Sequence, residues 1–495
     1  MGGETHPPKL ALDRERILDV YKAGPEAVIS LITYLADMYE ALSRQNEVLA
    51  QRIKELEERL RTDSHNSNKP PSSDGPAKRP YPARKPTGKK PGGQNGHRGQ
   101  TLRMTKTPDK IVIHEVEQCA GCGKPLKDHP AHDYERRQVF DVPPVAVEVT
   151  EHRAEIKDCP ECGQTTVASF PAEVAGMVQY GERLNAYAVY LKNYALLPYG
   201  RTAELFEDLF GVPLSEGTLV NITHRCAEKV GKAVQQIKEK LKAAEVIHCD
   251  ETGVRISKRL YWLHGVGTQT LTYYDVQEKR GSDAMDCIGI LEGYQGIAVH
   301  DHWGAYWKYG CVHALCNAHH LRELTFVWEM EDTQVWAKEM IEFLREAKKT
   351  VDGAKERGRQ RLKQIVEEEY QRRYRMLIAK GMKRNPPPIP EGRRKRGRMK
   401  KSKARNLLER LSKRQEETLR FLTDFRVAFD NNQGERDLRM MKVQQKISGT
   451  FRSLEGAAAF CRIRSYISTA RKHELNVIEA ISSVFAGRPL LLSHL

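Results

Sequence analysis

Long apolar runs are missing from this sequence, and cysteine is scarce. No stretch approaches the roughly 18 consecutive apolar residues that a membrane-spanning helix needs, and the N-terminal MGGETHPPKLALDRER has no apolar core of the kind found in secretion signals. Ten cysteines among 495 residues are too sparse for a disulfide scaffold. We therefore expect a cytoplasmic protein with no membrane partner.

Acidic residues are outnumbered by basic ones. The chain has 81 Lys and Arg against 65 Asp and Glu, a formal net charge of +16. Such a balance favours a polyanionic partner, in the first place nucleic acid, and a nucleoid-associated location; a soluble protein that happens to be basic is the alternative. At 495 residues the chain is too long for one hydrophobic core, so we expect three or more domains.

Leucine recurs every seven residues in the N-terminal region, residues 1–62. A second set of seam positions follows each leucine by four residues and includes Asn46, which favours a two-stranded parallel register when it pairs with its mate. The pattern predicts a coiled coil that forms a homodimer or higher oligomer; one amphipathic helix packed on its own domain is the alternative. The seam residues are Leu35, Tyr39, Leu42, Asn46, Leu49, Ile53, Leu56 and Leu60.

The heptad pattern stops in residues 63–110, which are rich in Pro, Gly, Ser and Asn and carry more basic than acidic residues. This composition cannot bury a core and predicts a flexible basic linker. Either the linker lies along DNA phosphates or it is a solvated tether.

Two CxxCG motifs, CAGCGK and CPECGQ, lie in residues 111–172. Each places two thiolates on a tight turn, and two such turns supply four sulfurs for a tetrahedral, structural Zn²⁺. In the segment between the two motifs, β-branched residues alternate with other residues, so we expect the turns to cap strands in a zinc-ribbon-like, DNA-binding module. A redox dithiol explains one motif but leaves the second unexplained. The expected zinc ligands are Cys119, Cys122, Cys159 and Cys162.

Residues 173–242 have helical patterns, two of which flank a Gly turn, and the second starts at the capping residue Ser215. This arrangement fits a helix-turn-helix DNA-binding domain. Helix pairs with a Gly turn also occur in helical domains of other function, so that alternative stays open.

Helical patterns also fill residues 333–425 and the C-terminal region, residues 456–495. A Pro-rich, strongly basic run interrupts the first of these at residues 383–405. Proline and charge exclude a packed core there, so we expect the run to contact DNA phosphates; a solvated loop is the alternative. Its central basic residues are Arg393, Arg394, Lys395 and Arg396.

Residues 243–332 begin with three β-rich runs, VIHCD, RLYWLHGVG and TLTYYDV, which predict an antiparallel meander. A helical pattern over residues 282–291 and a further strand, GIAVHD, follow. This order is the layout of a ribonuclease H-like α/β/α core, whose second part we place at residues 426–455. In that layout Asp250 and Asp301 lie side by side if the first and fourth strands pair in parallel.

Three carboxylates, Asp250, Asp301 and Glu435, are the candidate catalytic and metal-binding residues. Carboxylates are hard oxygen ligands suited to Mg²⁺ or Mn²⁺, and two such ions can serve phosphodiester displacement. We expect Asp250 to bridge the two ions and the other acids to flank them. Glu251 is a rival ligand, but on a strand its side chain faces away from that of Asp250.

Other candidate side chains lie near these acids in the sequence. Arg436 and Arg439 share one side of the helix expected around Glu435. Cys316 and His319, three residues apart at an expected helix start, either bind a metal or hold the helix by hydrogen bonds. We favour the structural role for this pair.

Several short motifs follow one another in a specific order: HNSNKPPSSD, the CxxC pairs, HCDETGVRI, VHDHWGAYW, CNAHHLREL and FDNNQGERDLR. By these motifs, over nearly the whole chain, the sequence resembles the transposases of the IS66 insertion-sequence family. The resemblance implies a DDE transposase whose ribonuclease H-like core is interrupted by a helical insertion, with Asp250, Asp301 and Glu435 as the triad. Gly434 is a departure, since Ala or a similar residue often stands there.

The resemblance also implies a reaction. Mg²⁺-dependent hydrolysis at the ends of the insertion sequence exposes 3′-hydroxyls, which then attack target DNA in strand transfer. The partners are then both DNAs and accessory proteins of the same element, and Arg436 and Arg439 hold a phosphate near the metals. Two other functions stay open: a zinc-containing DNA-binding regulator with inert carboxylates, and a structure-selective nuclease on the same fold.

Overall fold

The computed structural model describes residues 13–63, 65–67, 102–143, 145–331, 333–388, 399 and 401–493. The chain divides into two compact units, the first formed by Met1–Tyr81 with Cys316–Asp430 and the second by Pro82–Leu315 with Asn431–Leu495. Within the described ranges, no helix combines the length and the apolar character that crossing a bilayer requires. Helices and strands are both present, as expected, so the fold is of mixed α and β class.

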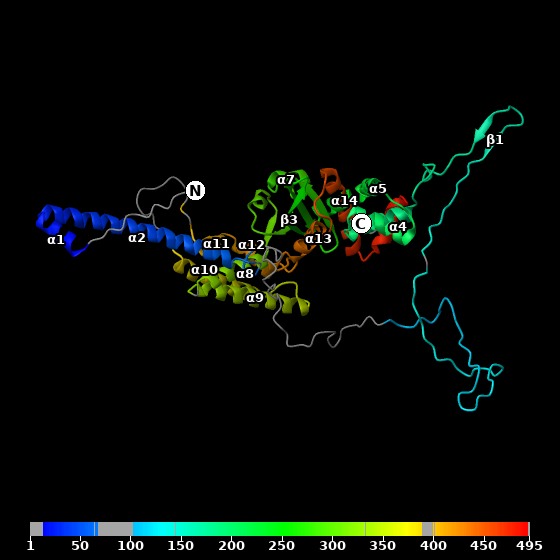
Figure 1. Ribbon diagram of the computed structural model, residues 1–495, viewed down its shortest axis with the longest axis horizontal. Coiled ribbons are helices and arrows are strands. Elements are labelled where there is room, and N and C mark those ends of the chain that lie inside the picture. The colour runs from blue at the N-terminus through cyan, green and yellow to red at the C-terminus, as the bar shows by residue number, and fades with distance from the viewer. Residues whose placement is uncertain are drawn as a thin grey trace. The chain divides into compact units, whose positions relative to one another are not determined.

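A five-stranded sheet lies at the centre of the second unit (Figure 1). The three strands β3, β4 and β5 are antiparallel neighbours, and β6 and β7 continue the sheet in parallel with β3. The expected meander followed by a parallel strand is confirmed. The strands are β3 (Val246–Ile256), β4 (Arg259–Gly267), β5 (Thr272–Gln277), β6 (Ile297–His300) and β7 (Val312–Leu315), in the spatial order β5-β4-β3-β6-β7.

Between β5 and β6 the chain forms helix α7 (Ser282–Ile288), and between β6 and β7 a 3₁₀ turn, η3 (Gly304–Lys308). Helix α7 is three residues shorter than the pattern predicts. It stops because Gly289, with φ 63°, adopts the left-handed conformation that ends a helix.

Helices precede and follow the sheet within the second unit. Ser215 caps the fifth helix as expected, since its side chain accepts a hydrogen bond from the backbone N–H of Thr218 at 3.0 Å. The first helix of this region, Glu182–Val189, is followed directly by a π-helical turn, Tyr190–Tyr194. The elements are α3 (Glu182–Val189), the π-helix η2 (Tyr190–Tyr194), α4 (Tyr199–Phe210), α5 (Glu216–Lys229), α6 (Gly231–Lys242), α13 (Asn432–Ser448), α14 (Leu454–Lys472), α15 (Val477–Phe485) and the 3₁₀ turn η4 (Leu490–Ser493).

One hydrophobic core joins these helices to the sheet. Ile222 of α5, Ile247 of β3 and Ile463 of α14 are each buried in it. Helix α14 also covers the edge strand β5, where the hydroxyl oxygen of Ser465 accepts from the N–H of Tyr274 at 2.9 Å and that of Thr469 accepts from the N–H of Thr272 at 3.0 Å. These hydroxyls bind backbone N–H groups of β5. At an open sheet edge such groups are unpaired and can pair with a strand of another chain.

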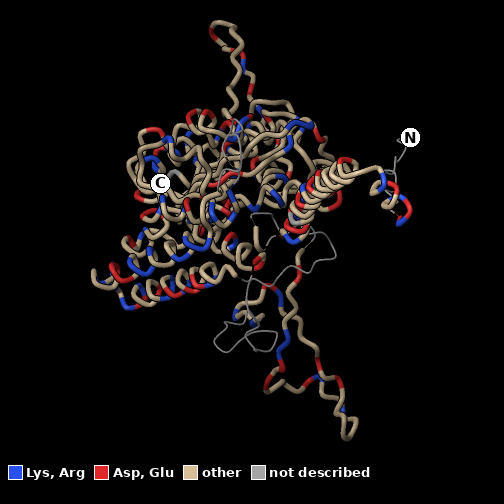
Figure 2. Tube along the Cα trace, turned by 90° about the vertical axis from the view of Figure 1, so that its left-hand side faces the viewer, with Lys and Arg blue, Asp and Glu red and all other residues tan. Residues whose placement is uncertain are grey.

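Among its described residues, the first unit contains helices and connecting turns but no strands. Its long helix α2 leaves the seam positions Leu42 and Leu49 about half exposed, at 53% and 51%. In Figure 2, positions of acidic and basic residues are interspersed along the helical segments of the trace. The elements are α1 (Arg14–Lys22), α2 (Pro25–Arg61), α8 (Asn317–Met330), α9 (Val335–Glu356), α10 (Gln364–Arg384), α11 (Lys403–Lys413) and α12 (Gln415–Thr423).

Only one short hairpin forms around the two cysteine motifs. Strands β1 (Ile156–Asp158) and β2 (Thr165–Val167) pair across the second motif, whereas the first carries one isolated bridge between Gln118 and Pro125. The alternating run before β1 has no paired strand among the described residues. The expectation that the turns cap strands is met at the second motif, whereas among the described residues the first motif has a single bridge, because alternation produces a strand only where a neighbouring backbone supplies hydrogen bonds.

Candidate functional site

Two of the predicted acids meet through the register of the parallel strands. Strand β3 pairs with β6 so that Val246 lies opposite Ile297 and His248 opposite Val299. Continued by two residues, the same register places Asp250 opposite Asp301, which is the first residue after β6. The parallel pairing that we predicted from the sequence is thus the feature that brings these two side chains together.

Helix α13 brings the third acid, since Glu435 lies in its first turn. Asn431, just before the helix, uses its side chain to bind the sheet. Its Nδ2 donates to the carbonyl of Cys249 at 2.8 Å, and its Oδ1 lies 2.8 Å from Nδ1 of His248. Because an amide oxygen can only accept, His248 carries a proton on Nδ1. Asn431 occupies the N-cap position of α13 but makes no side-chain cap hydrogen bond there; among the described contacts its side chain anchors α13 to β3 instead.

Glycines allow α13 to approach the sheet closely. A Cβ atom at Gly265 of β4 would lie 2.9 Å from Leu438, and one at Gly267 would lie 2.8 Å from the carboxylate of Asp437. Gly434 has a related role, because a Cβ there would lie 3.0 Å from the amide nitrogen of Asn431. Gly434, which stands where the family often has Ala or a similar residue, thus leaves room for the Asn431 side chain to reach the sheet.

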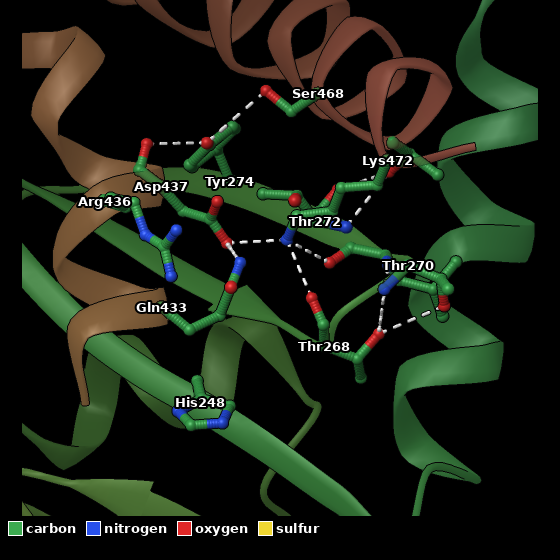
Figure 3. A network of polar contacts seen from close by, with 12 residues as sticks. His248, Thr268, Thr270, Thr272, Tyr274, Gln433, Arg436, Asp437, Ser468 and Lys472 are labelled. Atoms are coloured by element: carbon green, nitrogen blue, oxygen red, sulfur yellow. Dashed lines mark hydrogen bonds and ion pairs between the residues drawn. The ribbon is translucent and has the colours of Figure 1, made fainter. Parts of the chain in front are cut away.

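A second polar anchor holds α13 one turn further along (Figure 3). The ammonium of Lys472 lies 2.7 Å from the Asp437 carboxylate, which also accepts from Gln433 at 3.1 Å. Lys472 donates in addition to the carbonyls of Thr268 and Leu271, and Tyr274 donates to the carbonyl of Asp437 at 2.7 Å. Asp437 therefore ties α13 to α14 and to the β4–β5 turn, and it fixes the helix that carries Glu435.

The three acids share one electrostatic environment. Burial raises the pKa of Asp250 well above its usual value, and the negative charges of Glu251, Asp301 and Glu435 raise it further. The backbone N–H of Glu251 acts in the opposite direction, as it donates to Asp250 at 2.9 Å. A buried carboxylate among other carboxylates is costly unless a cation compensates it. Hard oxygen donors in this arrangement suit Mg²⁺ or Mn²⁺.

Glu251 faces the other side of β3, as we predicted. Val254 and Ile256, in register with Asp250, belong to the core cluster that includes Leu438 of α13. The side chain of Glu251 is fully buried and accepts from the Tyr306 hydroxyl at 2.8 Å and from Nε of Arg280 at 2.7 Å. Its charge is thus already compensated by the protein.

Arg280 was not identified from the sequence. It follows β5 in the segment EKRGSD, which has the composition of a turn, and no local pattern marks it. Its guanidinium contacts Glu251, lies 3.6 Å from Asp301, and stacks on Trp303 and Trp262 at 4.0 Å and 5.0 Å from the ring centroids. Such a set of partners, distant in sequence, becomes apparent only in the folded sheet.

The predicted DNA-contacting residues fall into two groups. Arg436 and Arg439 are both exposed on α13, one and four residues beyond Glu435. The basic residues Arg393, Arg394, Lys395 and Arg396, and most of the linker over residues 63–110, lie outside the described residues.

Cys316 and His319 lie at the start of α8, in the first unit. Cys316 is the N-cap residue of the helix and is buried, with 1% of its surface exposed. Burial and the nearby charges of Arg322 and Arg410 lower the pKa of His319 to about 4, so its imidazole is neutral at pH 7. A neutral imidazole serves hydrogen bonding and metal ligation equally, so both interpretations of the pair stay open.

Each of the two cysteine motifs forms its own turn, and the two turns have the same conformation. The N–H of Gly123 donates to the carbonyl of Cys119 at 2.9 Å, and that of Gly163 to the carbonyl of Cys159 at 2.9 Å, with both glycines at positive φ. Backbone amides of Gly121 and Cys122 lower the pKa of the Cys119 thiol, and those of Cys162 and Glu161 lower that of Cys159. Amides that stabilise a thiolate fit a zinc ligand. Within the described residues, the four sulfurs do not form one close group.

Comparisons with known families identify three regions. The model described as "Transposase IS66 family" matches residues 177–459, which include all three acids. The model of the "zinc-finger binding domain of transposase IS66" matches residues 117–163, which include the four cysteines. A family of unknown function matches residues 21–103. No curated protein matches the chain.

Proposed function

The chain belongs to the transposase IS66 family, and on this basis we propose that it is a DDE transposase that binds insertion-sequence ends and catalyses Mg²⁺-dependent DNA cleavage and strand transfer. The observation that carries the proposal is the parallel register of β3 and β6, together with the influence of Asp301 and Glu435 on the pKa of Asp250. The charges of Asp301 and Glu435, which come from distant parts of the chain, thus both act on Asp250.

The strand order supports a ribonuclease H-like core. Three antiparallel strands followed by two parallel ones, with an acid on the first strand and another at the end of the fourth, is the layout that we predicted for that fold. The first unit contributes the helical insertion, since residues Cys316–Asp430 separate β7 from α13.

The chain's own residues have distinct tasks in this mechanism. Asp250, Asp301 and Glu435 would hold the divalent cations, with Asp250 the acid whose pKa both of the others raise. When bound, Mg²⁺ or Mn²⁺ supplies the Lewis acidity that phosphodiester displacement requires. Arg436 and Arg439 neutralise a DNA phosphate beside the acids and so orient the scissile bond.

The remaining modules bring DNA and a second copy of the chain to this site. The zinc-finger region binds one structural Zn²⁺ through Cys119, Cys122, Cys159 and Cys162 and contacts DNA. Helices α4 and α5 present a helix-turn-helix surface, and the basic run at residues 393–396 adds phosphate contacts. The seam of α2 joins two chains, so that two DNA ends are held in one complex.

Strand transfer by an Asp250→Asn variant tests the proposal. The purified chain is incubated with labelled insertion-sequence ends, a target plasmid and MgCl₂. Wild type is expected to cleave the ends and join them to the plasmid, whereas the variant should bind the ends with unchanged affinity and join none.

The other outcomes contradict the proposal in recognisable ways. Cleavage without any joined product identifies a nuclease instead of a transposase. Unchanged function of Asp250→Asn indicates a DNA-binding regulator whose carboxylates are inert. A Glu292→Gln variant, which removes an exposed acid outside the site, is the matched control and should behave as wild type.

A further inference from the structure

Adjacent acids on β3 point to opposite faces of the sheet, and the second acid has partners that the proposed mechanism does not use. The side chain of Glu251 is completely shielded from solvent, yet Arg280 binds one of its oxygens through two nitrogens, at 2.7 Å and 2.6 Å. Tyr306 donates to its other oxygen at 2.8 Å. A buried ion pair of this kind is weak evidence for stability, because desolvation offsets its attraction. Its partners therefore need another explanation.

The guanidinium of Arg280 extends from Glu251 to Asp301. One nitrogen, Nη2, lies 2.6 Å from Glu251 and 3.6 Å from Oδ2 of Asp301. The other oxygen of Asp301, Oδ1, accepts from the backbone N–H of Trp303 at 2.8 Å. The two oxygens of Asp301 are thus oriented by separate groups, of which Arg280 is the one anchored to β3.

Stacking restricts the guanidinium further. Its central carbon lies 4.0 Å from the ring centroid of Trp303 and 5.0 Å from that of Trp262. Trp303 belongs to the turn after β6 that carries Asp301, and Trp262 belongs to β4. A planar guanidinium can stack and bond in its own plane at once, which an ammonium cannot do. Arg280 therefore links the turn that carries Asp301 to both β3 and β4.

We propose that Arg280, held by Glu251, is a positioning residue that fixes the Asp301 carboxylate relative to Asp250 for cation binding. Asp250 binds the cation directly. Glu251, on the opposite face of β3, holds Arg280, and Arg280 orients Asp301, the second ligand. The inference rests on the proposed function, because it assumes that Asp250 and Asp301 bind a divalent cation. It assigns separate tasks to the two adjacent acids of the HCDET motif.

Two possible roles of Arg280, a nearby positive charge and a positioning group, predict opposite changes in cation affinity when Arg280 is replaced. Loss of a positive charge beside the acids would by itself strengthen cation binding. Loss of a group that orients a ligand weakens binding by about 10–100-fold. The sign of the change in affinity therefore distinguishes the two roles, and it needs no measurement of activity.

The experiment measures Mn²⁺ binding to the full-length chain by electron paramagnetic resonance of the free ion, without DNA. Arg280→Gln is expected to bind Mn²⁺ about 10–100-fold more weakly than wild type. The double variant Glu251→Gln with Arg280→Gln, which buries no unpaired charge and leaves the net charge unchanged, should show the same loss. Arg280→Lys should recover only part of it, because an ammonium cannot bridge both acids while stacking.

Two control variants, Arg373→Gln and Asp250→Asn, distinguish failure of the positioning role from failure of the proposed function. Arg373→Gln breaks an ion pair with Glu346 on the helices of the first unit and should leave Mn²⁺ affinity unchanged. Affinity equal to or above wild type in both Arg280→Gln and the double variant overturns the positioning role alone, provided that Asp250→Asn loses binding. Equal binding by wild type and Asp250→Asn overturns the proposed function and this inference with it.

Discussion

The side-chain oxygen of Asn431 accepts a hydrogen bond from Nδ1 of His248 at 2.8 Å, across 183 residues of sequence. The same Asn431 donates to the carbonyl of Cys249. One amide thus holds the start of α13 against β3 two residues before Asp250. This contact therefore helps to fix the start of the helix that carries Glu435 relative to the strand that carries Asp250.

Replacement of Asn431 by Ala should destabilise the protein. The change leaves the Nδ1–H of His248 and the carbonyl of Cys249 without their partner, and each buried unsatisfied group costs about 1–3 kcal/mol. We expect the free energy of unfolding to fall by about 2–4 kcal/mol in urea titrations. The neighbouring Asn432→Ala variant, at an exposed first helical residue, serves as control. Equal stability of the two variants would show that the anchor is dispensable.

The stability of the protein should decrease on acidification because of His320. Burial, followed by the charge of Arg410, lowers the pKa of His320 to about 3, against 6.5 in an unfolded chain. A lowered histidine pKa means that only the unfolded state takes up the proton, so the stabilisation is complete above pH 6.5 and is lost as pH falls toward 3. His320→Asn should reduce the slope of unfolding free energy against pH by about 1.4 kcal/mol per unit in that window. The exposed His132→Gln is the control and should leave the slope as it is.

Zinc content tests the cysteine turns. We expect about one Zn²⁺ per chain in the purified protein by atomic emission, because two CxxC turns complete one tetrahedral site. Cys122→Ser and Cys162→Ser should each remove it. Cys287→Ser, an exposed cysteine outside both motifs, should retain it. Full zinc content in either motif variant would contradict a shared site.

If α2 forms the dimer, a negative charge on its seam should weaken the dimer, whereas the same charge on the opposite side of the helix should not. Leu49→Glu would place a carboxylate in an apolar interface, so the dissociation constant of the dimer should rise at least about tenfold in sedimentation experiments. Gln51→Glu adds the same charge to the exposed opposite side of the helix and should have little effect. A monomeric wild type would exclude the coiled coil.

The salt dependence of DNA binding should report on Arg436 and Arg439. Each phosphate contact contributes about 0.9 to the slope of log affinity against log salt concentration. In the absence of divalent cations, Arg436→Ala and Arg439→Ala should each reduce that slope by about this amount on any DNA sequence. Arg375→Ala, also an exposed arginine on a helix, is the matched control. An unchanged slope would show that neither arginine contacts a phosphate.

The sequence was sufficient to predict β3, β4, β5 and β6, and the meeting of Asp250 with Asp301 if β3 and β6 pair in parallel; it did not predict β7. The apolar runs before Asp250 and Asp301 are compact, and such runs pair in few ways. Arg280 and the anchoring role of Asn431 could not be predicted, because both depend on contacts between elements distant in sequence. Asn431 even has the local signature of a helix cap, which the sheet overrides. The roles of the three acids stay a prediction until the variants are measured.

The anchor at Asn431 also has a consequence for how the protein is made. The sheet that carries Asp250 and Asp301 is complete at Leu315, but the ribosome must synthesise the whole segment Cys316–Asp430 before Asn431 emerges. A chain interrupted anywhere in that segment has two of the acids and lacks the helix that holds the third. Under the proposed function, the acid site is therefore completed late in synthesis, and products truncated in that segment are expected to bind DNA without cutting it.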